Sequence, residues 1–316
     1  MKGNAAGILV AKLVLSAGLL ALVLAKVDPA SIFEVLLKAD RWLVLLWYSL
    51  VPVGVALTAW RWEILAPGLS FGTALKYTWI GVFFGHVLPG SIAGDIAKGV
   101  SLALRDASAR EGLAASIVAE KVIGLAALIL LFDLACAFVY ALYGDDYVQV
   151  RHLAVMALLL TLAVAIAAGV AAFVAARGEE SPVRETGGIL ARALRGVLAA
   201  SRFYGNRPAL LLKAFAISVA IHVLNIGAMY LSFHALRIDA GLLLAAVVYP
   251  VLSVMLLIPI SISGIGIRDA TLAVLFALFG FSAASGVAIS WLALLAMIPN
   301  IAIGGGVQLW EMYRKR

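Results

Sequence analysis

Residues 89–98 read PGSIAGDIAK and residues 259–268 read PISISGIGIR, and each stretch interrupts an otherwise apolar region. Aligned without gaps, the two stretches match at Pro89/Pro259, Ser91/Ser261, Ile92/Ile262, Gly94/Gly264 and Lys98/Arg268. Proline removes a backbone donor and glycine lowers helix stability, so both stretches are predicted to be breaks between helices. Matched breaks in the two halves of a chain are typical of a transporter's binding site. Short matches also arise by chance in membrane sequences rich in isoleucine, glycine and serine.

The composition places the chain among integral membrane proteins. Of its 316 residues, 64% are hydrophobic and 13% are charged, and the mean hydropathy is +1.08. A charged fraction about half that of soluble domains excludes disorder and argues against a soluble enzyme. The net charge of +7 comes largely from loop cations, which the positive-inside rule and anionic lipids explain better than nucleic acid does. A single cysteine, Cys136, rules out an internal disulfide.

Apolar segments predict an all-α polytopic membrane protein in one domain, residues 1–316. The predicted spans are residues 8–24, 42–60, 112–143, 154–176, 210–236 and 284–303, and the broken regions are residues 73–104 and 242–279. If each broken region is a re-entrant hairpin there are six spans, and if both cross fully there are ten. Residues 7–24 also fit a signal peptide, but we favour an uncleaved first span.

Two amphipathic surface helices are predicted between the spans. Asp28 and Pro29 form a helix start for residues 31–38, because Asp caps helix N-termini and Pro suits the first turn. Within residues 177–207, one helical face is apolar and another carries arginines, a pattern that suits an anionic membrane surface.

The distribution of cations predicts the orientation. Sixteen lysines and arginines fall on the side of the N-terminus and five on the other, so both termini are expected to be cytoplasmic. Three crossings in each half then predict an inverted-topology repeat of residues 1–148 and 149–316. The two breaks should meet near the membrane midplane in such a repeat.

Several charged residues lie at membrane depth, where each costs roughly 2.5–3.5 kcal/mol at a helix centre. They are Asp95, Lys98, Glu120, Lys121, Asp133, Arg268 and Asp269. One interpretation is that they form structural ion pairs, with Asp95 at i,i+3 from Lys98 and Asp269 beside Arg268. The other is that Lys98 and Arg268, each one turn beyond the shared glycine, bind a phosphate at a helix start.

The remaining residues and motifs give weaker evidence about function than the two breaks and the charged residues do. His86 and His222 lie in apolar helices without a metal-ligand neighbour at i+3 or i+4, so we interpret them as packing or hydrogen-bonding residues. The spacing of Gly90 and Gly94 is a common packing motif. The sequence has no P-loop, zinc-protease or nucleophile-elbow motif, so we expect no cofactor, no metal and no enzymatic activity of those kinds.

Taken together, these motifs resemble those of the lysylphosphatidylglycerol synthase transmembrane-region family, also called flippase-like integral membrane proteins. The resemblance rests on Gly94-Asp95 with Lys98, Glu120-Lys121 before Gly124, Arg61-Trp62 at the end of the second span, and GIGIRD at residues 264–269. The chain has Ala93 where the family usually has the first glycine of Gly-Gly-Asp. In the late motif it has Ser263 for glycine and Asp269 for glutamate, which leaves the substrate open.

This resemblance implies lipid translocation at an inner or plasma membrane, without the lysine transfer that relatives perform with a cytosolic synthase domain. We expect an anionic lipid head group to be the partner, with no nucleic acid, and with a homo-oligomer or a lipid-synthesis enzyme as a further partner. The candidate substrate-binding residues are Arg61, Ser91, Asp95, Lys98, Glu120, Lys121, Ser261, Arg268 and Asp269. Two alternatives stay open: a membrane enzyme that uses Asp95 or Glu120 as an acid/base, and a non-transporting scaffold of a lipid-synthesis complex.

Overall fold

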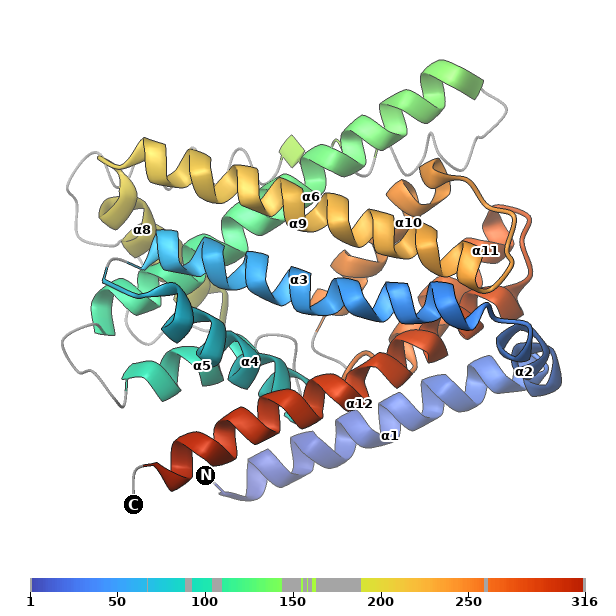
Figure 1. Cartoon of the computed structure of the whole chain (residues 1–316), viewed down its shortest axis with the longest axis horizontal. Coiled ribbons are helices and arrows are strands. Elements are labelled where there is room, and N and C mark those ends of the chain that lie inside the picture. Colours follow the sequence, from blue (N-terminus) through green and yellow to red (C-terminus); the bar gives the residue numbers. More distant parts are fainter. Residues whose placement is uncertain are drawn as a thin grey trace. The chain divides into compact units, whose positions relative to one another are not determined.

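The structure is a computed structural model that describes residues 2–66, 68–88, 93–103, 110–143, 155, 158, 161–162, 189–258 and 261–314. Of these described residues 87% are helical and none lies in a strand, which confirms the all-α prediction. The helices are α1 (Lys2–Lys26), α2 (Pro29–Leu37), α3 (Arg41–Leu65), α4 (Phe71–Val87), α5 (Ala93–Ala103), α6 (Arg110–Tyr143), α8 (Ile189–Tyr204), α9 (Pro208–Ala235), α10 (Leu242–Leu257), α11 (Ile267–Leu278) and α12 (Ala283–Tyr313) (Figure 1).

Four of these helices, α3, α6, α9 and α12, are long and apolar enough to cross a membrane. A fifth span is formed if α1 and α2 are counted together, although α2 is bent by 86° from α1. The predicted span over residues 154–176 lies almost entirely outside the described residues. The described helices therefore confirm a polytopic membrane protein, while the inverted repeat and its two halves stay predictions.

Asp28 starts α2 as predicted. Its carboxylate accepts hydrogen bonds from the backbone N–H groups of Ala30 and Ser31, both at 3.2 Å, and Pro29 occupies the first turn. These bonds, led by the one from Ala30, hold the pKa of Asp28 below its usual value. The Phe33 ring then packs edge-on against Trp291, with ring centroids 5.5 Å apart, and so fixes α2 against α12.

Both predicted breaks separate two helices. The first lies between α4 and α5, although residues 89–92, with Ser91, are outside the described part of the chain. The second lies between α10 and α11, where α10 ends at Leu257 and the next residue, Ile258, is extended at φ −69° and ψ 116°. Neither α4 nor α10 is long enough to count as a complete span.

The last helix is longer than predicted. The predicted span ends at residue 303, and the three glycines of residues 304–306 follow it. Instead, α12 runs on to Tyr313. A Cβ on Gly304 would lie 2.3 Å from the carbonyl oxygen of Trp79 and 2.8 Å from the Cβ of Phe83, so glycine here allows α12 to approach α4 closely.

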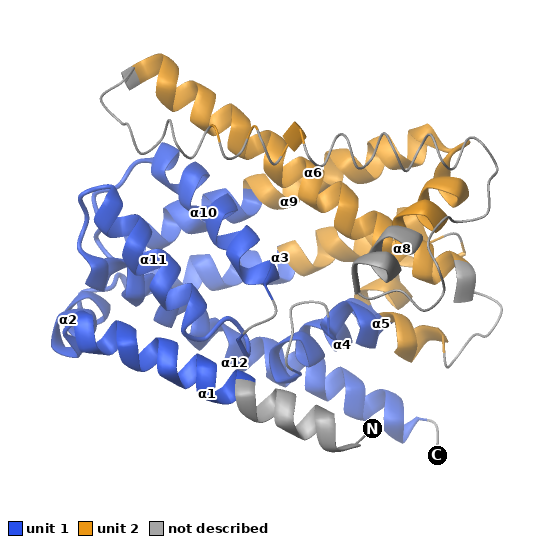
Figure 2. Ribbon diagram, turned by 180° about the vertical axis from the view of Figure 1, so that it is seen from behind, with its two compact units in different colours: residues 1–53, 76–98, 224–316 blue, residues 54–75, 99–223 orange. Residues whose placement is uncertain are grey.

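The chain divides into two compact units (Figure 2). Unit 1 comprises residues 1–53, 76–98 and 224–316, and unit 2 comprises residues 54–75 and 99–223. In unit 1, α11 contacts α1, α10 and α12. A Cβ on Gly286 of α12 would lie only 2.4 Å from the carbonyl oxygen of Leu272 on α11, which shows how closely these two helices pack.

In unit 2, α8 packs against α6. The core here consists of Leu65, Ala115, Ala119, Ala200, Tyr204 and Ala214. The Tyr204 hydroxyl donates to the carbonyl of Leu65, and burial raises the pKa of Tyr204 to about 12. The arginine-bearing first half of α8 lies outside the described side chains, so its contact with a membrane surface stays a prediction.

Three glycines set the spacing of α4 and α5 within unit 1. A Cβ on Gly94 would lie 2.3 Å from the carbonyl oxygen of Gly81 and 3.1 Å from the Cα of Gly85. Such distances are below van der Waals contact and involve backbone, which cannot move aside easily. The two helices of the first hairpin therefore meet backbone to backbone.

We predict that Gly94→Ala lowers the free energy of unfolding by about 1–3 kcal/mol, because the added methyl group forces α4 and α5 apart. Thermal unfolding in detergent measures the effect. Gly227→Ala is the matched control, since a Cβ at this α9 position meets nothing within 4 Å. Equal melting temperatures for the two variants would contradict the prediction.

Candidate functional site

The second break is a tight turn over residues 261–266. Ser263, Gly264 and Gly266 all have positive φ, at 53°, 77° and 82°. Glycine accepts this conformation without strain, whereas Ser263 carries a cost of roughly 1–3 kcal/mol unless its surroundings impose the conformation. A Cβ on Gly266 would lie 2.8 Å from the carbonyl oxygen of Ser16 on α1, so this glycine is also required for the contact between the turn and α1.

Two neighbouring helices, α1 and α4, contribute hydrogen-bond partners to the polar groups of this turn. The Ser16 hydroxyl accepts a hydrogen bond from the backbone N–H of Ile262 at 3.1 Å. The Ser263 hydroxyl donates to the carbonyl of His86, at the end of α4, at 2.6 Å. These bonds replace the helical ones that the break removes, as a backbone at membrane depth requires.

Asp269 completes the turn. One interpretation of the sequence pairs it with Arg268, but in the structure its Oδ2 accepts from the backbone N–H of Gly266 at 2.8 Å and caps the start of α11. The side chain is fully buried, and its other oxygen, Oδ1, has no hydrogen-bond partner among the described residues. Asp269 thus acts electrostatically on Arg268 without a direct ion pair.

Arg268 is held by neutral groups. Its Nη2 donates to the carbonyl of Ser263 at 2.9 Å and lies 3.8 Å from the sulfur of Met297. The Nε atom is buried and has no hydrogen-bond partner within the described chain. No described carboxylate oxygen lies within 4.0 Å of its guanidinium. A partly buried cation is therefore left with an unused donor in the turn of the second break.

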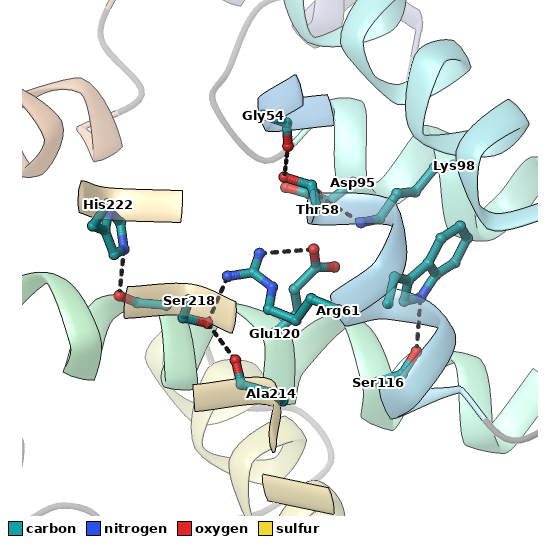
Figure 3. A network of polar contacts seen from close by, with 12 residues as sticks. Gly54, Thr58, Arg61, Asp95, Lys98, Ser116, Glu120, Ala214, Ser218 and His222 are labelled. Atoms are coloured by element: carbon teal, nitrogen blue, oxygen red, sulfur yellow. Dashed lines mark hydrogen bonds and ion pairs between the residues drawn. The ribbon is translucent and has the colours of Figure 1, made fainter. Parts of the chain in front are cut away.

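Lys98 takes the equivalent position after the first break. It is 2% exposed, and its Nζ lies 3.4 Å from Oδ1 of Asp95, so the predicted i,i+3 pair is present (Figure 3). The site residue Ser261 is also buried, while Ser91 falls outside the described residues. At their described ends the two breaks are joined directly, by the hydrogen bond from Ser263 to His86.

A second polar network lies in unit 2 and ties three helices together. Arg61 on α3 donates from Nη2 to Glu120 on α6 at 2.8 Å, and from Nη1 to Ser218 on α9 at 2.9 Å (Figure 3). The carboxylate side chain is 2% exposed. Gly124 leaves room for the guanidinium, since a Cβ there would lie 3.3 Å from Nη1. This arginine is already neutralised, which distinguishes it from Arg268.

The neighbours of this network explain two further residues. His222 lies 2.9 Å from the carbonyl oxygen of Gly124, which confirms that it is a hydrogen-bonding residue. Trp62 donates to the hydroxyl of Ser116 at 3.0 Å. Lys121 is exposed although Glu120 is buried, because successive helix residues point about 100° apart. The side chain of Lys121 therefore lies on a more exposed face of α6 than the buried carboxylate of Glu120.

Sequence reasoning missed several members of these contacts. Ser218 is one of them: it lies at i,i+4 from His222 in an apolar helix, a spacing that puts both on one face and is a usable signal for the serine. The pair of Lys76 and Glu311, with Nζ and Oε1 2.7 Å apart, gave no local signal because 235 residues separate its members. Within the described residues no group of three or more histidine, cysteine or acidic side chains is arranged to hold a metal ion.

Comparison with known proteins gives one match. The family described as "Lysylphosphatidylglycerol synthase TM region" matches residues 9–304 and confirms the resemblance read from the motifs. No curated protein and no solved structure matches this chain.

We predict that removing either partner of the buried pair, by Arg61→Gln or Glu120→Gln, costs about 3–5 kcal/mol of folding free energy, because the remaining charge is left uncompensated. The double variant should cost less than the sum of the two. Unfolding in a graded detergent–denaturant series measures this cycle. Glu34→Gln and Lys38→Gln, on an exposed pair, are the controls and should leave stability unchanged. Additive losses at positions 61 and 120 would refute the coupling.

Proposed function

The chain belongs to the lysylphosphatidylglycerol synthase TM-region family, and from this premise we propose that it moves an anionic phospholipid or lipid-linked head group between membrane leaflets. The family is a membrane family linked to lipid handling, and the chain is an integral membrane protein. Translocation by a flippase or scramblase is the more specific step that we add.

Arg268 is the observation that carries this proposal. Desolvating a cation is costly unless an opposite charge compensates it, and Arg61 and Lys98 both have a carboxylate in contact. Arg268 has none within 4.0 Å among the described residues, and this sets it apart from Arg61. Its Nε, like that of Arg61, is buried without a hydrogen-bond partner in the described part of the chain. An anionic ligand is the simplest group that would satisfy both needs. The guanidinium fork suits the oxygens of a phosphate.

Lys98 provides the second half of the proposed cycle. Its Nζ lies 3.4 Å from the carboxylate of Asp95, which is long for a charge-assisted hydrogen bond. A phosphate that approaches this cation competes with Asp95 and loosens the resting pair. Because a ligand shifts an equilibrium only by its differential affinity, this exchange is what couples lipid binding to movement of the hairpins. The acyl chains stay in the bilayer throughout.

The remaining site residues have supporting roles in this proposal. Ser261 is buried beside the second break and offers its hydroxyl group to the head group, and we expect the same role for Ser91, its match in the sequence of the first break. Arg61 and Glu120 fix the helices of unit 2, and Lys121 attracts anionic lipid from the surface. We place the protein in an inner or plasma membrane with both termini cytoplasmic, and a second copy or a lipid-synthesis enzyme as its partner.

We expect Arg268→Gln and Lys98→Gln to abolish lipid movement while the protein still inserts and folds, because each removes one of the two cations that receive the phosphate. Asp95→Asn should slow it by leaving Lys98 without its resting partner. Leaflet-resolved transport of fluorescent phospholipids in proteoliposomes, at matched protein levels, is the measurement.

Lys38→Gln, which neutralises an exposed cation on α2, is the matched control and should transport at the wild-type rate. Wild-type transport in both cation variants would end the proposal. If the protein is a non-transporting scaffold, neither the wild type nor any variant should move lipid. If it is an enzyme that acts on a lipid-linked substrate, mass spectrometry should detect a covalently altered lipid.

The proposed orientation has its own test. In a Cys136→Ala background, Asp145→Cys should react with a membrane-impermeant thiol reagent from the outside, because the cation distribution puts this turn opposite the N-terminus. If the cysteine at position 145 reacts only after the reagent is given access to the cytoplasmic face, the proposed orientation is wrong.

A further inference from the structure

We propose that His86 is a head-group-binding residue: its imidazole and the guanidinium of Arg268 hold two oxygens of the same lipid phosphate. This inference rests on the proposed function and deepens it, since it names a phosphate, and not a carboxylate, as the group that is recognised.

The backbone places His86 beside Arg268. His86 lies in the last turn of α4, immediately before the first break, and its carbonyl accepts the hydrogen bond from the Ser263 hydroxyl at 2.6 Å. The carbonyl of the same Ser263 accepts from Nη2 of Arg268 at 2.9 Å. Ser263 thus links the backbone of His86 to the guanidinium of Arg268. The charge of Arg268 also acts electrostatically on the imidazole of His86.

Both side chains retain hydrogen-bonding capacity. The imidazole of His86 is half-buried and makes no hydrogen bond to any described residue. His222, the comparable histidine of α9, bonds the carbonyl of Gly124 at 2.9 Å. The Nε of Arg268 is likewise unpartnered among the described atoms. Buried polar groups in proteins are nearly always hydrogen-bonded, and the Nε of Arg268 is such a group. The half-buried imidazole of His86 adds a second hydrogen-bonding group beside it, so a ligand with several acceptor atoms would serve both.

The charged groups around His86 leave it available for such a ligand. On α11, Asp269 is engaged in capping Gly266, and Arg268 repels a second positive charge. On α5, Asp95 is paired with Lys98. No carboxylate of either helix is hydrogen-bonded to the imidazole in the described structure. A phosphate would supply an acceptor for His86 and, at the same time, a negative charge in direct contact with Arg268, which Asp269 does not provide.

The geometry of two separate donors favours phosphate over carboxylate. A carboxylate presents two oxygens in one plane and is fully used by a single guanidinium fork. A phosphate has further oxygens directed out of that plane, and one of them remains for the imidazole. Removing His86 should therefore weaken phosphate binding selectively.

The test compares three probes on the purified full chain in detergent: dioctanoyl phosphatidic acid, dodecanoate as the carboxylate lipid, and inorganic phosphate. We expect His86→Leu to weaken phosphatidic acid binding about tenfold by calorimetry, the effect of one lost hydrogen bond to a charged group. His86→Gln keeps an N–H donor and should recover most of this loss. Dodecanoate affinity should change little in either variant.

His222→Gln is the matched control, because it alters the other histidine of an apolar helix outside the turn, and it should bind all probes as the wild type does. Equal phosphatidic acid affinity in His86→Leu and wild type, or an equal loss for dodecanoate, overturns the inference. If the protein binds inorganic phosphate but does not bind phosphatidic acid, the claim that the recognised phosphate belongs to a lipid is overturned. If His86→Leu does not fold, wild-type affinity in both His86→Gln and His86→Ala overturns it instead.

The two proposals fail separately. Binding that depends on His86 in a protein that moves no lipid retains this site and removes the transport function. Lipid movement that is insensitive to every change at position 86 retains transport and removes the site.

Discussion

The structure depends on one constraint: a helix broken in apolar surroundings must find partners for the backbone groups that the break releases. Around the second break these partners come from three places in the sequence, namely the Ser16 hydroxyl, the carbonyl of His86 and the carboxylate of Asp269. Each partner fixes one element against the turn, so α1, α4 and α11 are positioned by the same requirement. The small residues follow from it, because Gly266 has to approach the backbone of α1 to within contact.

The same constraint applies to charge, and the chain meets it in two ways. Arg61, Lys76 and Lys98 each have a carboxylate partner, and the pairs formed by the first two join separate helices. Arg268 is instead surrounded by a carbonyl and a thioether. Asp269 acts on this guanidinium without an ion pair, so its desolvation is compensated less fully than that of the paired cations. An incompletely compensated buried cation is typical of a binding site, because a bound anion would itself compensate the charge.

Local features were predictable from the sequence, and long-range ones were not. Proline and glycine located both breaks, and Asp28 located the start of α2, because these residues act through their own backbone. The i,i+3 pair of Asp95 and Lys98 follows from helix geometry alone. The contact between Arg61 and Ser218 spans 157 residues, and its register depends on how helices pack. Even within a single turn the sequence does not decide every contact. A carboxylate beside Arg268 could form an ion pair with it or cap the start of α11, and the conformation of the turn selects the cap for Asp269.

The two kinds of contact around the breaks differ in how easily they can be exchanged. Gly94 meets Gly81 backbone to backbone, a close contact that involves no side chain able to change its rotamer. The hydrogen bond of Ser263 to His86 is worth about 1 kcal/mol net, and another acceptor can replace the carbonyl at little cost. A ligand that binds between these groups therefore acts on the exchangeable polar links and leaves the glycine contacts intact. On the proposed function, α4 and α5 move as one rigid hairpin, and the site of change is the polar junction between the ends of the two breaks.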